Sequence, residues 1–129
     1  MKKLAFLLLA VMMLTACGQD KENDRGAVYL NITAEEAKRI MDNEDDYILL
    51  DVRTREEYDQ GHIPGATQIS HEEIAEKAEQ VLTDKEQLIL VYCRSGRRSK
   101  IAAEALAELG YTNIKEFGGI IDWPYEVEK

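Results

Sequence analysis

Two segments of this chain are nearly continuous runs of aliphatic residues, at positions 47–52 (YILLDV) and 87–93 (QLILVYC). Runs of this length are typical of strands that are buried on both faces in a parallel sheet. Shorter apolar segments at 66–70 and 113–117 predict two further strands, and residues 28–30 predict an additional short one. We therefore expect a mostly parallel sheet of four to five strands.

The segments between these strands have apolar residues at helical spacing. Three predicted helices begin with a hydroxyl residue that is followed three positions later by glutamate, which is the pattern of a capping box. These pairs are Thr33 and Glu36, Thr54 and Glu57, and Ser70 and Glu73. Because strands and helices alternate along the whole segment, the pattern predicts an α/β sandwich.

The first residues have the pattern of an export signal and are set apart from the fold. Lys2 and Lys3 precede the apolar run 4–14. This run is too short to cross a hydrocarbon core of about 30 Å as a helix, but it suits the apolar region of a signal peptide. We therefore assign residues 1–16 to a signal peptide.

The four residues 14–17 (LTAC) resemble a bacterial lipobox. The resemblance implies that Cys17 becomes the first residue of the mature protein and carries acyl chains, which together anchor it stably to a membrane. Residues 17–27 then form the lipidated cysteine with a flexible tether, and 28–129 form the domain. We expect a cell-envelope protein, lipid-anchored and facing the extracytoplasmic side. The alternative is a soluble secreted protein with an ordinary cleavage site.

Charge and cysteine content restrict the function further. The chain has a formal net charge of −9, and loss of Lys2 and Lys3 makes it still more acidic. Such a balance argues against a nucleic-acid partner, which requires an excess of Lys and Arg. With Cys17 bound to lipid, Cys93 has no cysteine left for an intramolecular disulfide. An exported lone thiol is either buried and inert or present for chemistry.

The residues around Cys93 favour chemistry over a core role. Cys93 ends the most apolar strand, and a helix is predicted to begin near Arg98 or Ser99. Gly96 allows the loop to turn its amides inward, towards the strand end where parallel sheets bind ligands. The cationic residues nearby are Arg94, Arg97, Arg98 and Lys100. Amides, helix N-terminus and cations all favour a thiolate and attract an anionic substrate.

Three stretches in this order resemble the motifs of rhodanese-domain sulfurtransferases: 49–66 (LLDVRTREEYDQGHIPGA), 93–98 (CRSGRR) and 117–124 (FGGIIDWP). The resemblance covers about residues 28–125 and implies a rhodanese-like three-layer α/β sandwich. It implies that Cys93 takes a sulfane sulfur from an anionic donor such as thiosulfate and holds it as a persulfide. A thiol or other nucleophilic acceptor then removes the sulfur. No metal and no organic cofactor are implied, and we expect a monomer.

The resemblance also assigns roles to the loop and its surroundings. The expected substrate-binding residues are Arg94, Ser95, Gly96, Arg97, Arg98 and Ser99. Arg98 and the loop amides would hold the persulfide and the anionic end of the donor, while Arg94 and Arg97 would shape donor preference at the pocket mouth. Residues expected to support the site, chiefly by fixing loop geometry, are Asp51, Arg53 and His62. The helix glutamates, Glu57 among them, are expected on solvated faces and not as metal ligands.

Two other functions are compatible with a reactive Cys93. Related phosphatases and arsenate reductases place an arginine six positions after the cysteine, because a tetrahedral oxyanion needs a wider loop. Here the sixth position is Ser99 and the arginine at the fifth is Arg98, so the shorter loop favours sulfur transfer. The other alternative is a membrane-tethered rhodanese-like module that binds persulfide or senses redox state without turnover.

Overall fold

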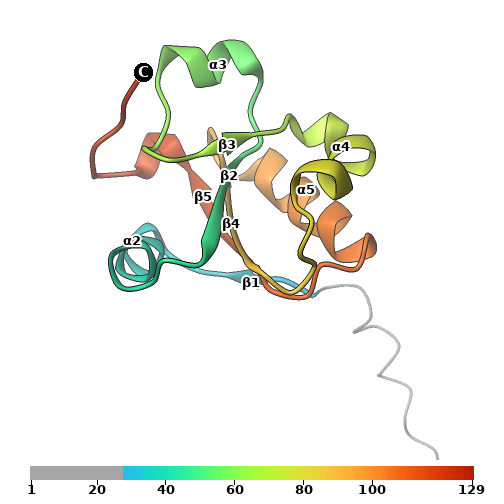
Figure 1. The fold of residues 1–129 in the computed structure, drawn as a ribbon. Helices are drawn as coiled ribbons and strands as arrows, with labels where there is room; N and C mark the ends of the chain where they lie inside the picture. The colour runs from blue at the N-terminus through green and yellow to red at the C-terminus, as the bar shows by residue number, and fades with distance from the viewer. Residues whose placement is uncertain (1–27) are drawn as a thin grey trace, which may run out of the picture.

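The computed structural model describes residues 28–129 (Figure 1). It contains one five-stranded sheet with the order β1-β5-β4-β2-β3, in which all neighbouring strands are parallel. The strands are β1 (Leu30–Asn31), β2 (Tyr47–Asp51), β3 (Thr67–Gln68), β4 (Leu88–Cys93) and β5 (Ile114–Gly119). The predicted parallel sheet is therefore confirmed. The predicted signal peptide, the lipid site at Cys17 and the tether lie outside the described residues.

Within residues 28–129, four α-helices and one short 3-10 helix lie between the strands, and a second 3-10 helix follows β5. They are α2 (Ala34–Asn43), α3 (Arg55–Gln60), η1 (His71–Glu73), α4 (Ile74–Val81), α5 (Arg97–Glu108) and η2 (Ile120–Asp122). None of these described helices is long and apolar enough to cross a membrane.

The capping boxes that begin at Thr33 and Thr54 are both formed. The one predicted at Ser70 is wrong, because the next three residues form a 3-10 helix without a side-chain cap. The Ser70 hydroxyl donates to the carbonyl oxygen of Arg53 instead, at 3.3 Å. Ser70 therefore ties η1 to the end of β2.

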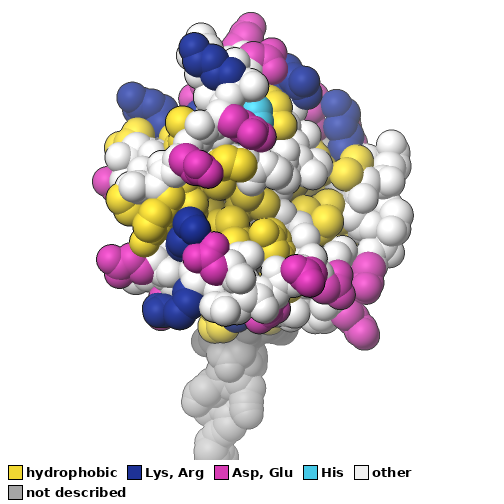
Figure 2. Space-filling model, turned by 60° about the vertical axis from the view of Figure 1, so that its left-hand side comes forward, with side chains coloured by type: hydrophobic (Ala, Val, Ile, Leu, Met, Phe, Trp, Pro, Cys, Tyr) yellow, Lys and Arg dark blue, Asp and Glu magenta, His cyan; other side chains and the backbone are white. Residues whose placement is uncertain are grey.

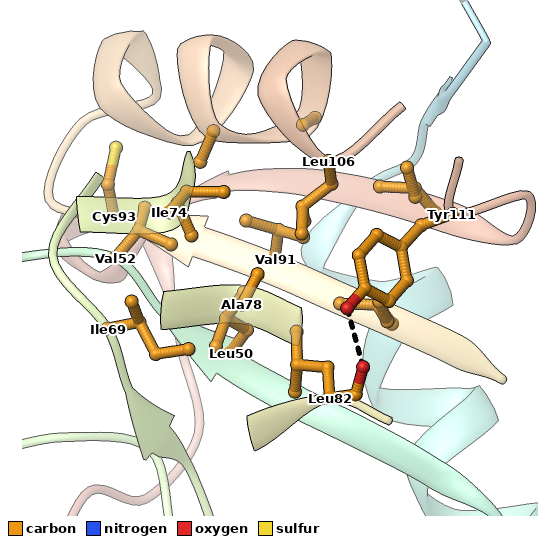
Figure 3. Close-up of a cluster of buried hydrophobic side chains, with 14 residues drawn as sticks. Leu50, Val52, Ile69, Ile74, Ala78, Leu82, Val91, Cys93, Leu106 and Tyr111 are labelled. Carbon is orange, nitrogen blue, oxygen red and sulfur yellow. Dashed lines mark hydrogen bonds between the residues drawn. The ribbon is translucent and has the colours of Figure 1, made fainter. Parts of the chain in front are cut away.

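Helices cover both faces of the sheet, which gives the three layers that were predicted. On one face, α4 and α5 pack on a cluster of buried side chains (Figure 3). On the other, α2, α3 and the C-terminal segment pack on a second cluster, which includes Ala37, Phe117 and Trp123. A fully buried aliphatic or aromatic side chain contributes about 1.5–3 kcal/mol relative to an exposed one. These two clusters therefore make β4 a rigid support for the cysteine at its end.

The side of the molecule that carries α2 and the C-terminal segment is shown in Figure 2. An apolar area there is surrounded by charged side chains of both signs. A groove on the α2 side is lined by the apolar and aromatic side chains of Met41, Tyr47, Trp123 and Tyr125 and by the charged side chains of Lys38, Asp42 and Glu126. Basic and acidic side chains are thus interspersed on this face.

Candidate active site

Cys93 lies at the carboxyl end of β4, where the chain turns into α5 (Figure 3). Its side chain is buried, with 1% of the residue exposed. The backbone amide of Gly96 donates a hydrogen bond to Cys93 Sγ at 2.9 Å. Gly96 is the N-cap of α5 and has a left-handed conformation with φ of 112°, which glycine adopts without strain. The predicted turn is confirmed, and α5 begins at Arg97, one or two residues earlier than the predicted Arg98 or Ser99.

The N-terminus of α5 is open to an anion. In the described part of the chain no side chain caps this helix, and its first turn contains no acidic residue. The helices α2 and α3, in contrast, begin with full capping boxes and two glutamates in the first turn. The unpaired amides and positive dipole end of a helix attract negative charge. The start of α5, which follows β4 after a short loop, therefore offers unpaired amides next to Cys93.

The loop after Cys93 rests directly on the end of β5. The register between β4 and β5 joins Val91 to Glu116 but Cys93 to Gly119, so β5 contains one extra residue, as in a β-bulge. A Cβ atom on Gly119 would overlap the backbone of Arg94 and of the residue that follows it. Glycine is required here for close approach, a role that the motif at 117–124 does not predict by itself.

A buried carboxylate that the sequence does not predict, Glu116, lies beneath this loop. It is fully buried and accepts hydrogen bonds from Asn31 Nδ2 and from the Gly118 amide, the latter at 2.9 Å. It also accepts one from the hydroxyl of Ser99, whose Oγ lies 3.5 Å from Cys93 Sγ. The available signal was a charged residue at a core-facing position of a buried strand.

Arg98 forms an ion pair with Glu57, and its expected contact with substrate stays a prediction. The guanidinium donates to both carboxylate oxygens of Glu57, at 2.8 and 3.0 Å. The side chains are only 18% and 27% exposed, so the expectation of a solvated Glu57 is wrong. The capping box fixes Glu57 in the first turn of α3, facing α5. Arg94 and Arg97, in contrast, are exposed.

The ion pair between Glu57 and Arg98 predicts a pH-dependent contribution to stability. The hydrogen bond from Arg98 lowers the pKa of Glu57 to about 2. A carboxyl group with a lowered pKa stabilises the fold above its unfolded-state pKa and loses this effect as pH falls towards its folded-state pKa. Because the pair is partly solvated, we expect Glu57→Gln to lower the free energy of unfolding by about 1 kcal/mol at pH 7. The difference should disappear progressively between about pH 4.5 and pH 2.

Urea unfolding of the two proteins at pH 7 and pH 2 measures this difference. The matched control is Asp59→Asn, which removes the exposed pair with Arg55 on the same helix and should change the free energy of unfolding by less than about 0.5 kcal/mol. Since glutamine also serves in a capping box, the helix start is retained in Glu57→Gln. Equal destabilisation at both pH values would show that charge is not the cause.

Asp51 and Arg53 form a buried ion pair that positions the neighbouring loop. Arg53 Nη2 lies 2.7 Å from an Asp51 carboxylate oxygen and donates to the carbonyl oxygen of Gly61 at 2.7 Å. The Tyr92 hydroxyl donates to Asp51 at 2.6 Å and accepts from the Ile63 amide at 3.0 Å. Burial raises the pKa of Tyr92, so its phenol remains protonated as a donor. These contacts agree with the expected structural role.

His62 is held within the same loop. Its ring stacks on Tyr58 with centroids 3.7 Å apart, and Nδ1 lies 2.9 Å from the Tyr58 carbonyl oxygen. Its Nε2 lies 3.4 Å from a carboxylate oxygen of Glu128, and the two residues also form a backbone bridge. His62 thus fastens the C-terminal segment to the loop after α3, as expected of a residue that fixes loop geometry.

Comparison with known proteins places this site in a wider context. Residues 33–124 match the family model of the rhodanese-like domain. The thiosulfate sulfurtransferase PspE of Escherichia coli is 41% identical over 73 residues, which are 57% of this chain and 70% of that protein. A sulfurtransferase of Allochromatium vinosum is 38% identical over 88 residues, covering 67% of this chain and 79% of that protein. The solved structure of a rhodanese with anions from E. coli has a TM-score of 0.60 at 37% identity and covers 64% of this chain and 98% of that one.

Proposed function

This chain belongs to the rhodanese-like domain family, and we propose that it is a sulfurtransferase that carries sulfane sulfur as a persulfide on Cys93. One observation carries the proposal: Cys93 Sγ accepts the Gly96 amide at an uncapped helix start. This arrangement favours negative charge on sulfur. The names of the sulfurtransferase relatives support the same activity.

In the first half-reaction, the Cys93 sulfur attacks the sulfane sulfur of an anionic donor such as thiosulfate. A new sulfur–sulfur bond forms at Cys93, and the donor's sulfur–sulfur bond breaks so that its electron pair leaves with sulfite. The terminal persulfide sulfur is then the negatively charged atom next to the first turn of α5. The amides of that turn and the exposed Arg94 and Arg97 supply a positive environment for donor and persulfide alike.

In the second half-reaction, a thiolate or cyanide attacks the terminal sulfur of the persulfide. The bond between the two sulfur atoms breaks, and Cys93 leaves with the electron pair as a thiolate. The Gly96 amide donates to this sulfur, so the same hydrogen bond favours Cys93 as nucleophile and as leaving group. A double displacement through one thiol needs only this chain and its two substrates.

The compact loop supports sulfur transfer over hydrolysis of an oxyanion ester. Only Arg94, Ser95 and Gly96 separate Cys93 from α5, and the loop is pressed against Gly119. The arginine at the fifth position, Arg98, is occupied by Glu57. A phosphate ester would need more donors arranged around a larger tetrahedral group, whereas a single sulfur atom needs a narrow cradle.

Initial-rate kinetics with thiosulfate as donor and cyanide as acceptor test this function. We expect thiocyanate to form with parallel double-reciprocal lines, the pattern of a double displacement. A persulfide that forms without turnover would instead favour the binding or redox-sensing module. Hydrolysis of p-nitrophenyl phosphate or reduction of arsenate without sulfur transfer would favour the phosphatase-type alternative.

We also propose that the mature protein is lipid-anchored through Cys17 and acts at the extracytoplasmic side of the cell envelope. The lipobox-like residues 14–17 support this proposal. We expect the native protein to fractionate with membranes and to carry acyl mass on Cys17. The variant Cys17→Ser should leave the membrane fraction and keep its sulfur transfer. A mature N-terminus at another residue without acyl mass would contradict the anchor.

A further inference from the structure

The hydroxyl of Ser99 is surrounded by more acceptors than its single proton can serve. Its Oγ lies 3.1 Å from the Gly96 carbonyl oxygen, 3.4 Å from that of Gly118 and 3.5 Å from Cys93 Sγ, and it also contacts the Glu116 carboxylate. An ionised carboxylate is the strongest of these acceptors. While Ser99 donates to Glu116, its contact with Cys93 is favourable only when the thiol donates to the Ser99 oxygen.

The converse arrangement connects the two titratable groups. If Glu116 carries the proton, it donates to the Ser99 oxygen, and the Ser99 hydrogen is free to point at a Cys93 thiolate. We propose that Glu116 is a positioning residue that acts through Ser99 as proton acceptor for the Cys93 thiol. This proton transfer rests on the proposed function, because it takes place during the sulfur-transfer reaction proposed for Cys93.

The proton movements complete the proposed half-reactions. As Cys93 Sγ bonds to the sulfane sulfur, its S–H proton passes to the Ser99 oxygen, and the Ser99 proton passes to Glu116 Oε2. The donor fragment leaves with the electron pair of the broken sulfur–sulfur bond. When an acceptor takes the terminal sulfur, Cys93 leaves as a thiolate, and the proton returns from Glu116 through Ser99. The sum of protons and charge in the site is unchanged over one cycle.

The carboxylate is held in place before any substrate binds. Asn31 from β1 donates to one oxygen of Glu116, while the Gly118 amide donates to the other. Glu116 faces α5 because its register partner on β4 is Val91, which belongs to the core cluster on that side. A preorganised group of this kind needs no rearrangement during reaction.

Other charged groups also act on this site. The charged or titratable groups near Cys93, Glu116 or their neighbours come from several elements. They are Tyr29 next to β1, Glu104 of α5, the Arg98–Glu57 pair between α5 and α3, the Arg53–Asp51 pair at the end of β2, and the exposed Arg94, Arg97 and Lys100 of the loop and α5. Among the hydrogen bonds of the described residues, only Glu116 connects to the sulfur through one hydroxyl. The variants below therefore leave these other groups unchanged.

The rate of Cys93 alkylation by iodoacetamide as a function of pH tests the proposal in the full chain. Glutamine is neutral and can donate to Ser99, as the protonated carboxyl group would. Glu116→Gln should therefore shift the midpoint of the profile about one pH unit lower, which gives about tenfold faster alkylation at pH 6. Ser99→Ala should act in the opposite direction and slow alkylation at pH 6 about threefold or more. The plateau rate at high pH reports how accessible the sulfur is to the reagent, whereas the midpoint reports ionisation of the thiol. A variant that only opens the loop would therefore change the plateau and leave the midpoint unchanged.

The matched control is Glu108→Gln, the same change at the exposed last residue of α5, which should leave the midpoint within about 0.2 pH units. When Ser99→Ala is also present, Glu116→Gln should change the alkylation rate at pH 6 by about threefold or less. The hydroxyl that connects Glu116 to Cys93 is then absent, so only the direct charge effect of Glu116 on the sulfur remains. A purely structural role for Glu116 predicts no shift of the midpoint. An unchanged midpoint in Glu116→Gln, or an equal shift with and without Ser99, would overturn the proposal. Alkylation needs no sulfur donor, so this outcome is separate from a failure of the proposed function.

Discussion

Replacing Cys93 with serine is expected to lower sulfur transfer from thiosulfate to cyanide by at least about a thousandfold. The reaction requires a polarisable nucleophile that gives up its proton far more readily than an alcohol and leaves again as a stable anion, and a serine hydroxyl meets neither requirement. The measurement is the initial rate of thiocyanate formation at saturating thiosulfate, compared between wild type and Cys93→Ser.

The fold should tolerate this change. The serine oxygen can still accept the hydrogen bond from the Gly96 amide and contact Ser99, as Cys93 Sγ does. The free energy of unfolding should therefore fall by about 1 kcal/mol or less. Loss of activity without loss of structure assigns the effect to the sulfur. Transfer that persists above about one tenth of the wild-type rate would exclude Cys93 as the sulfur carrier.

The second large effect is expected for Gly119→Ala. The backbone of Gly119 has φ of −136° and ψ of 159°, which any residue adopts, so the substitution causes no backbone strain of its own. The cost arises because the added Cβ would overlap the backbone of Arg94 and Ser95. We expect the free energy of unfolding to fall by about 3 kcal/mol. Sulfur transfer should fall about a hundredfold or more, because a loop displaced by about 1 Å misplaces the Gly96 amide relative to Cys93.

Gly65→Ala is the matched control for this substitution. Gly65 has φ of 86°, and no atom lies within 4 Å of an added Cβ. Gly65→Ala should therefore lower the free energy of unfolding only by the cost of a left-handed alanine, about 1 kcal/mol, and should retain sulfur transfer. Thermal unfolding and thiocyanate formation are measured for both variants. If Gly119→Ala keeps wild-type activity, contact between the loop after Cys93 and β5 does not position the Gly96 amide for catalysis.

The layered fold could be predicted from sequence because its signals are local or periodic. The aliphatic run ending at Cys93 predicted a strand buried on both faces, and β4 is buried at every position. Thr33 and Thr54 carry their capping partners three residues away. The box at Ser70 failed because its hydroxyl is used by a residue distant in sequence, the carbonyl of Arg53, and local patterns contain no information about such competition.

The same limit explains which parts of the site were missed. The position of Cys93, the glycine turn after it and the uncapped helix all follow from one contiguous stretch. Glu57 and Glu116 reach the site from α3 and β5, and their roles depend on which face of each element meets α5. A surface glutamate and a functional one have the same local pattern when the partner lies 41 or 17 residues away. Only the packed structure distinguishes them.

The most direct test of sulfur transfer through Cys93 is the intact mass of the protein after treatment with thiosulfate and desalting. We predict a gain of one sulfur atom, located by peptide mapping on Cys93 and absent in Cys93→Ser. Addition of cyanide should remove that sulfur and release one equivalent of thiocyanate. A protein that gains no sulfur, or gains it on another residue, would contradict the mechanism.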